Sequence, residues 1–157
     1  RLGGDCHRCV PSAVFEFGSK FNAQTNPKHS TKECQLMKYV RLYADSDGVS
    51  HFEDIEVSTK SQNFAPPSPP AFISEPIATA QMLFNRLPAG WYGDWHPAPK
   101  RQFGILMDGE LEVTAGDGET RTFKAGDVRL LEDTFGKGHQ TKVIGDRDVL
   151  NAIIQLD

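Results

Sequence analysis

The stretch QFGILMDGELEVTAGDGETRTFKAGDVRLL, residues 102–131, carries the clearest fold signal in the chain. It contains two Asp-Gly pairs, Asp108-Gly109 and Asp117-Gly118, and apolar and polar residues alternate around them. Asp-Gly between alternating segments is the strongest short-range signal for a β-hairpin, because the tight turn requires positive φ. This stretch therefore predicts consecutive antiparallel strands joined by short turns.

The same period-two pattern extends outward on both sides of this stretch. No segment shows sustained helical periodicity, and turn signals recur about every 8–12 residues, which is typical of an antiparallel sandwich or barrel. Residues 64–76 contain five prolines and predict an irregular strap over the domain surface. The fold class predicted is all-β, with further strands over residues 39–43, 52–58, 80–87, 139–144 and 149–156.

Length and charge limit the possible partners. The chain has 157 residues, within the range of one domain, and a formal net charge of −4. No block of clustered Lys and Arg supplies a phosphate-binding surface, so we expect no nucleic-acid partner. No window approaches the run of about 20 apolar residues that a membrane span needs. We expect no membrane partner and a cytoplasmic location.

The first 36 residues differ in composition from the rest. They show neither the apolar region nor the cleavage site of a signal peptide, and residues 22–35 are almost wholly polar. We interpret residues 1–36 as an extension and residues 37–157 as the folded domain. The alternative is an arm in which residues 14–17 add an edge strand to the domain or its neighbour.

All three cysteines lie in this opening segment. Cys6 and Cys9 form a C-x-x-C pair, and His29 and Cys34 follow, so a zinc site is one hypothesis. The second half of the pattern lacks the spacing of a zinc finger, and no βαβ context supports a redox pair. Incidental cysteines are the simpler interpretation, and an odd count disfavours a disulfide framework.

The candidate metal-ligating residues lie in the second half of the chain. Asp94 and His96 lie two apart on a predicted strand, so they are expected on one face. His139 opens a later strand after a glycine-rich turn, and Gln102 begins the strand before Asp108. Two imidazoles and a carboxylate are the ligands of a facial triad for ferrous iron, and they also suit zinc, nickel or manganese.

These residues resemble the two motifs of the cupin family. The first family motif is Gly, five residues, His-x-His, three or four residues, Glu, six residues, Gly. Here Asp94-Trp95-His96 is followed by five residues, Gln102, six residues and Gly109. In the second motif a glycine precedes Pro-x-Gly, two residues and His; here Gly126 precedes Thr-Phe-Gly at 134–136, two residues and His139.

The resemblance implies a double-stranded β-helix, also called a jelly roll, with metal ligands at Asp94, His96, Gln102 and His139. Asp94 stands where the family has His, and Gln102 stands where it has Glu. The implied function is binding of a small organic molecule by a metal-dependent enzyme, of dioxygenase, isomerase or lyase type. The alternative is a non-catalytic binding module with a metal-free polar pocket.

The resemblance also implies self-association. Small cupins pair through sheet edges, and the strands over 39–43 and 52–58 are the expected edges. We therefore expect a homodimer with two-fold symmetry.

Overall fold

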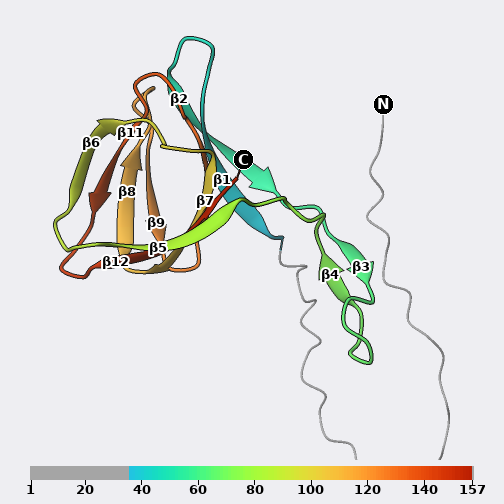
Figure 1. Cartoon of the computed structure of the whole chain (residues 1–157). Helices are drawn as coiled ribbons and strands as arrows, with labels where there is room; N and C mark the ends of the chain where they lie inside the picture. Colours follow the sequence, from blue (N-terminus) through green and yellow to red (C-terminus); the bar gives the residue numbers. More distant parts are fainter. Residues whose placement is uncertain (1–35, 157) are drawn as a thin grey trace, which may run out of the picture. The chain divides into compact units, whose positions relative to one another are not determined.

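The computed structural model describes residues 36–156. In this range the regular secondary structure consists of β-strands alone (Figure 1). The all-β prediction is confirmed. Within these residues there is no helix of the length and apolarity that crossing a membrane requires. The predictions for the first 35 residues, which include the three cysteines and His29, lie outside the described range.

Six strands form the larger sheet, in the order β2-β1-β10-β7-β12-β5. Its centre is built from strands that the 102–131 pattern and the C-terminal alternation predicted. The strands are β1 (Lys38–Ala44), β2 (Ser50–Glu56), β5 (Gln81–Leu87), β7 (Gln102–Asp108), β10 (Val128–Glu132) and β12 (Val149–Gln155).

Four strands form the second sheet, in the order β6-β11-β8-β9. The strands are β6 (Tyr92–His96), β8 (Glu110–Thr114), β9 (Thr120–Lys124) and β11 (His139–Val143). β8 and β9 form the hairpin that Asp117-Gly118 predicted, with Thr114 opposite Thr120. The chain passes from β7 to β8 at Gly109, whose φ of +82° lies in the left-handed region. The hairpin expected at Asp108-Gly109 is wrong, because the chain crosses here from one sheet to the other and β7 and β8 do not pair.

The apolar core lies between the two sheets. Alternation along β8 buries Leu111 and Val113, and the facing sheet contributes Leu42, Leu106 and Val149. Each of these five side chains is at most 2% exposed. The two facing sheets give the jelly-roll arrangement predicted from the sequence.

The prediction for the first strand is wrong in one respect. β1 was expected at a sheet edge, but it lies inside the sheet between β2 and β10. It pairs with β10 in parallel, with Val40 opposite Arg129. Alternation predicts which face a residue takes and not which strand lies beside it, so this long-range pairing left no signal. β2 does lie at the edge, as predicted.

The proline-rich segment is more regular than expected. β3 (Lys60–Gln62) and β4 (Ala71–Ile73) pair with each other as a separate two-stranded sheet. The prolines at 66–70 lie in the connection between them. The strap is therefore a hairpin whose strands form no ladder with either larger sheet (Figure 1).

Candidate functional site

A cavity of about 300 Å³ lies between the two sheets. This volume is at the lower end of the range of about 300–1,000 Å³ found for small-molecule sites. Polar and apolar side chains share its wall. The lining residues are Asn85, Leu87, Trp91, His96, Ala98, Pro99, Gln102, Leu111, Arg129, Leu131, His139, Thr141, Asn151 and Ile153. Three of the four residues singled out in the sequence are among them.

His139 is oriented by a buried carboxylate. The side chain is 4% exposed, and its Nδ1 lies 2.6 Å from Oδ2 of Asp133, which follows β10 and is itself 0% exposed. A carboxylate acceptor at Nδ1 favours the tautomer with the proton on Nδ1. The lone pair of Nε2 then remains for a partner in the cavity.

His96 lies beside His139 in the adjacent strand. The two residues are paired in the β6–β11 ladder, and their ring centroids are 4.6 Å apart. The Nδ1 of His96 lies 2.5 Å from the backbone carbonyl oxygen of Asp94. Both imidazoles therefore have Nδ1 occupied and Nε2 available for chemistry.

Asp94 does not line the cavity, and the prediction that it shares a face with His96 is wrong. The β6–β11 pairing shifts between His139 and Thr141, so Asp94 and Trp95 together oppose one residue. Such a bulge breaks the two-residue alternation on which the prediction depended. Trp95 does not line the cavity either; Lys137 Nζ lies 3.6 Å from its ring centroid.

The Asp94 carboxylate has partners of its own away from the cavity. Its Oδ1 accepts hydrogen bonds from Gln140 Nε2 at 2.9 Å and from the Trp95 backbone N–H at 2.8 Å. The hydrogen bond from Gln140 is the main reason that the pKa of Asp94 lies below its ordinary value. Asp94 is thus an exposed, satisfied anion.

Gln102 does reach the cavity. It is the first residue of β7 and is 7% exposed. Its Oε1 accepts a hydrogen bond of 3.4 Å from Gln155 Nε2 on the neighbouring β12. Gln102 therefore presents an amide to the cavity from the six-stranded sheet, while the two imidazoles belong to the four-stranded sheet.

Arg129 is the site residue that the motif comparison missed. It lines the cavity from β10, is 6% exposed, and its Nη2 donates to Oδ1 of Asn151 at 2.8 Å. Burial lowers its pKa to about 10. Asn151 in turn donates from Nδ2 to Oδ1 of Asn85 at 3.0 Å. The sequence signal was available: each of these three polar residues has an apolar residue directly before it in its strand.

The residues of the cavity do not fit the four-ligand metal site expected from the sequence. Two imidazoles and one amide remain, since Asp94 is turned away and Asp133 is directed at His139. Within residues 36–156, no group of three or more His, Cys, Asp or Glu side chains is arranged to hold an ion. Arg129 adds a positive charge to the same wall.

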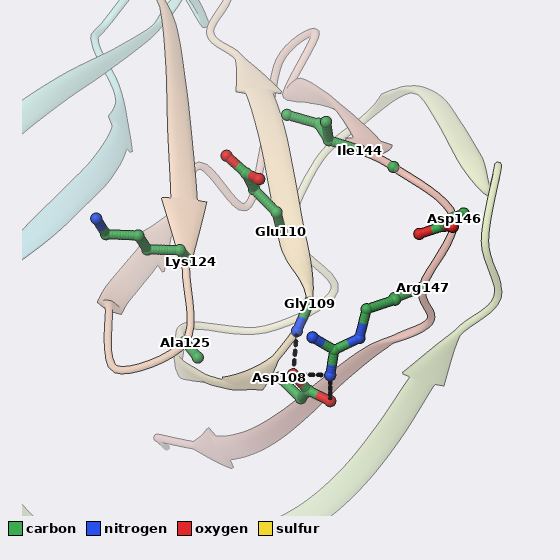
Figure 2. A pocket seen from close by; sticks show the side chains of 9 residues that line it. Asp108, Gly109, Glu110, Lys124, Ala125, Ile144, Asp146 and Arg147 are labelled. Carbon is green, nitrogen blue, oxygen red and sulfur yellow. Dashed lines mark hydrogen bonds and ion pairs between the residues drawn. The ribbon is translucent and has the colours of Figure 1, made fainter.

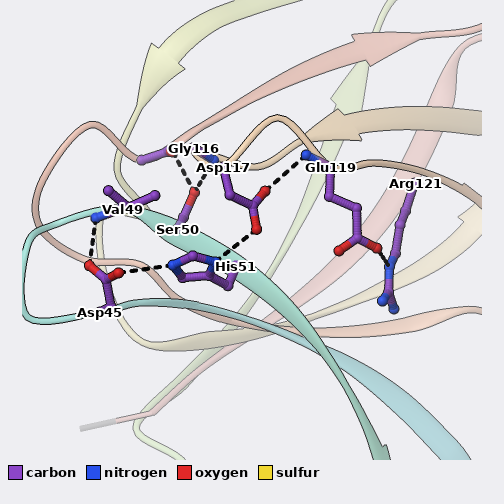
Figure 3. A network of polar contacts seen from close by, with 9 residues as sticks. Asp45, Val49, Ser50, His51, Gly116, Asp117, Glu119 and Arg121 are labelled. Atoms are coloured by element: carbon purple, nitrogen blue, oxygen red, sulfur yellow. Dashed lines mark hydrogen bonds and ion pairs between the residues drawn. The ribbon is translucent and has the colours of Figure 1, made fainter.

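The turn that leads into His139 is held from outside the cavity. Ser50 Oγ donates to the Gly138 carbonyl at 2.7 Å. It also accepts from the Gly116 N–H at 2.6 Å (Figure 3). Gly138 has φ +73°, and a Cβ there would overlap the backbone of His96. Glycine at 138 is therefore required for the close approach of the two histidine-bearing strands.

His51 joins two loops beside this turn (Figure 3). Its Nε2 lies 2.9 Å from Asp45 Oδ2, and its Nδ1 lies 2.7 Å from Asp117 Oδ2. The hydrogen bonds to Asp45 and Asp117 raise the pKa of His51, and contact with His51 helps to lower the pKa of both carboxyls. Both ring nitrogens are used, so His51 is a structural cation.

A second hollow, of about 370 Å³, is larger than the cavity but is lined by no histidine. It lies where the β7–β8 and β9–β10 turns meet residues 144–147 (Figure 2). Its main polar contact is the exposed ion pair of Arg147 with Asp108, with Nη2 2.7 Å from Oδ1. Exposed pairs of this kind are satisfied by water, so we assign no function to it.

Comparison with known proteins gives neighbours among solved structures alone. No family model and no curated protein matches the chain. A Cupin 2 conserved barrel domain protein from Salinispora arenicola is 24% identical, with a TM-score of 0.42, over 63% of this chain and 76% of that one. The Schizosaccharomyces pombe Cnp3 cupin domain is 18% identical, with a TM-score of 0.39, over 80% and 86%.

A further solved neighbour is an RmlC-like cupin protein from Desulfovibrio desulfuricans. It is 11% identical, with a TM-score of 0.36, over 83% of this chain and 97% of that one. All three neighbours are described as cupins.

Proposed function

We propose that this cupin-like domain binds a small organic molecule between its two sheets, through direct contacts with His96, Gln102 and His139. The observation that carries the proposal is the cavity of about 300 Å³ itself. Its polar side chains come from both sheets, and its apolar side chains, such as Trp91 and Leu131, fill the wall between them. A few convergent polar groups on an apolar wall are typical of a ligand site.

The two histidines suit this role because each keeps one ring nitrogen for the ligand. Nε2 of a histidine protonated on Nδ1 accepts a hydrogen bond, and Gln102 can donate or accept one. The carboxylate of Asp133 also holds the His139 ring in one orientation, as an imidazole that transfers protons requires. The pair thus leaves room for proton-transfer chemistry without defining a reaction.

The experiment is ligand-observed NMR with a library of small polar fragments on the full chain. In Leu131→Trp the indole fills the cavity, and we expect fragment binding to be lost. Leu150→Trp is the matched control, because Leu150 is 39% exposed on the opposite face of the same sheet. Binding that is absent from the wild type, or is equal in both variants, contradicts the proposal.

A metal site made of His96, His139 and Gln102 is the second candidate function. The observation that favours it is that both Nδ1 atoms have acceptors, as metal-ligating histidines usually have. A bound ion would polarise a ligand oxygen or activate water in the cavity. Asp94 takes no part in this smaller site, because its carboxylate contacts Gln140 outside the cavity.

A further inference from the structure

We propose that the ligand of this cavity is a small organic carboxylate, recognised by the guanidinium of Arg129. This inference rests on the proposed function and narrows it to a chemical class. It depends on residues that the motif comparison did not single out: Arg129 on β10, Asn151 on β12 and Gly104 on β7.

Arg129 is a buried cation without an acidic partner. Its guanidinium donates to the neutral amide of Asn151, and its buried Nε has no hydrogen-bond partner. Within the described residues 36–156, Arg129 forms no ion pair. The carboxyl of Asp127 favours its charge from a distance, but that group accepts a hydrogen bond from the Lys124 backbone N–H.

An unpaired charge in such a place is costly for the folded chain. A buried charge without an opposite charge beside it loses its hydration and is not compensated by an ion pair. The Asn151 amide and the Phe123 ring, 5.3 Å from the guanidinium carbon, are its neutral contacts. Neutralising Arg129 by deprotonation is no solution, since its pKa of about 10 keeps it charged at neutral pH. An anion from solution that enters the cavity supplies the missing partner.

The sheet is built so that Arg129 can cross it. Gly104 is the cross-strand partner of Arg129, and a Cβ there would lie 3.2 Å from Nη2 of the guanidinium. The glycine leaves space for the side chain to extend over β7 towards Asn151 on β12. Asn151 is itself held by Asn85, so the guanidinium is oriented before a ligand arrives.

The rest of the wall favours an organic anion over inorganic phosphate. Leu87, Trp91, Leu111 and Leu131 line the same cavity and would contact an apolar body. Arg129 belongs to the six-stranded sheet, whereas His96 and His139 belong to the four-stranded sheet. A ligand between the sheets would therefore have its carboxylate towards Arg129 and a second polar group towards the imidazoles.

The test compares carboxylates with their neutral amides on the full chain. Benzoate and butyrate are titrated beside benzamide and butyramide, with inorganic phosphate as a compact anion, and dissociation constants are measured by NMR. We expect each carboxylate to bind at least about tenfold more tightly than its amide, since charge-assisted hydrogen bonds are about twice as strong as neutral ones. Phosphate is expected to bind more weakly than either carboxylate.

Arg129→Met provides the second readout. The variant removes the charge and keeps an apolar chain, so we expect the preference for carboxylate over amide to vanish. Arg41→Met is the matched control, because Arg41 on the adjacent β1 has its own acidic partners, Glu53 and Glu132. This control should keep the full carboxylate preference. If Arg129→Met fails to fold, the comparison of carboxylates with amides on the wild-type chain still tests the carboxylate inference.

Each outcome has a defined meaning. Amides that bind as tightly as carboxylates, or phosphate that binds more tightly than benzoate, overturn the carboxylate inference. Neutral fragments that bind in the cavity while no carboxylate does overturn it as well, but leave the proposed function standing. If no fragment of either kind binds, the proposed function fails together with this inference.

Discussion

The two faces of the six-stranded sheet differ in the residues that depart from the usual pattern of an apolar inside and a polar outside. The inner face presents Gln102, Arg129 and Asn151, which are 7%, 6% and 2% exposed. The outer face leaves large apolar side chains in solvent, with Met82 55% and Phe84 69% exposed. A folding core alone explains neither face. The inner polarity fits a ligand, and the outer apolar surface fits a protein partner.

Two arginines on neighbouring strands make the difference concrete. Arg41 on β1 points to the outer side and contacts both Glu53 and Glu132. Arg129 on β10 points inward and contacts the neutral Asn151. The exposed cation has two anions although water would solvate it, and the buried cation has none. This contrast is what a ligand-binding role for Arg129 predicts.

The largest effect expected on the inner side comes from Asp133→Ala. This change leaves the buried Nδ1–H of His139 without its acceptor, which should destabilise the chain by about 2 kcal/mol. Fragment affinity should fall with it, because the His139 ring loses its orientation. The free energy of unfolding is measured by urea denaturation and the affinity by NMR.

Asp133→Asn is the matched control for this prediction. The amide oxygen of Asn can still accept from Nδ1, so the orientation of His139 should persist and the affinity should change little. If Asp133→Ala binds fragments as the wild type does, His139 has no part in the site.

On the outer side, Phe84→Ser tests whether a homodimer forms through the β5 end of the sheet, opposite the 39–43 and 52–58 strands expected from the sequence. Phe84 lies on the edge strand β5, and Met82, Met107 and Leu150 are also exposed on this sheet. If a second copy covers this face, losing one large apolar side chain should weaken self-association by at least about tenfold, as at an interface hot spot. Sedimentation or light scattering across a concentration series measures the effect.

Phe72→Ser is the control for the outer face. Phe72 is 72% exposed, about as much as Phe84, but it lies on β4, outside the sheet. We expect this variant to associate as the wild type does. A wild-type chain that stays monomeric across micromolar concentrations rejects the homodimer.

Much of this architecture was predictable because the signals are local. Asp108-Gly109 and Asp117-Gly118 require particular turns, and alternation around them gives the strands and the face of each residue. His96, Gln102 and His139 were correctly expected to face a common space. This expectation came from the resemblance of their spacing to the two cupin motifs.

The rest could not be predicted because it depends on distant pairing. The bulge at Asp94 arises from register against β11, some 45 residues later in the chain, and one extra residue reverses the direction of the carboxylate. The role of Arg129 requires knowing that β7 and β12 lie beside β10 in the folded sheet. Alternation within one strand contains neither fact.

A smaller effect is expected at His51, a surface cation that resembles Arg41 in having two carboxylate partners. Its pKa is raised above 6.5, so its stabilising contribution is complete below that pH and is lost as pH rises through the higher folded value. The pKa values of Asp45 and Asp117 are lowered, so their contribution is lost only in acid. The thermal midpoint should therefore decline from about pH 6 to pH 8.

His51→Gln should flatten that decline, and added salt should reduce it in the wild type because the pairs are near the surface. Thermal unfolding across the pH range measures both. A wild-type midpoint that does not fall over this range, or a decline that is unchanged in His51→Gln, contradicts the assignment of His51 as a structural cation.

The smallest effect is expected from metal removal. If the inner face recognises its ligand through Arg129 and the imidazoles directly, then treatment with a chelator should leave the dissociation constant of benzoate unchanged. The physical reason is the donor set: two imidazoles and an amide without a carboxylate, beside a buried cation, bind a divalent ion weakly. Elemental analysis before and after chelation accompanies the titration.

Should the purified chain instead hold about one transition-metal ion and lose benzoate binding with it, the second candidate function replaces the first. In that case His96→Ala and His139→Ala should each abolish metal binding, while Gln102→Ala should reduce it far less, because a neutral amide adds little to the affinity. Equal loss of metal binding in all three variants would mean that Gln102 is a full ligand. The metal would then be held by both sheets, with Gln102 from the six-stranded sheet and the two histidines from the four-stranded sheet.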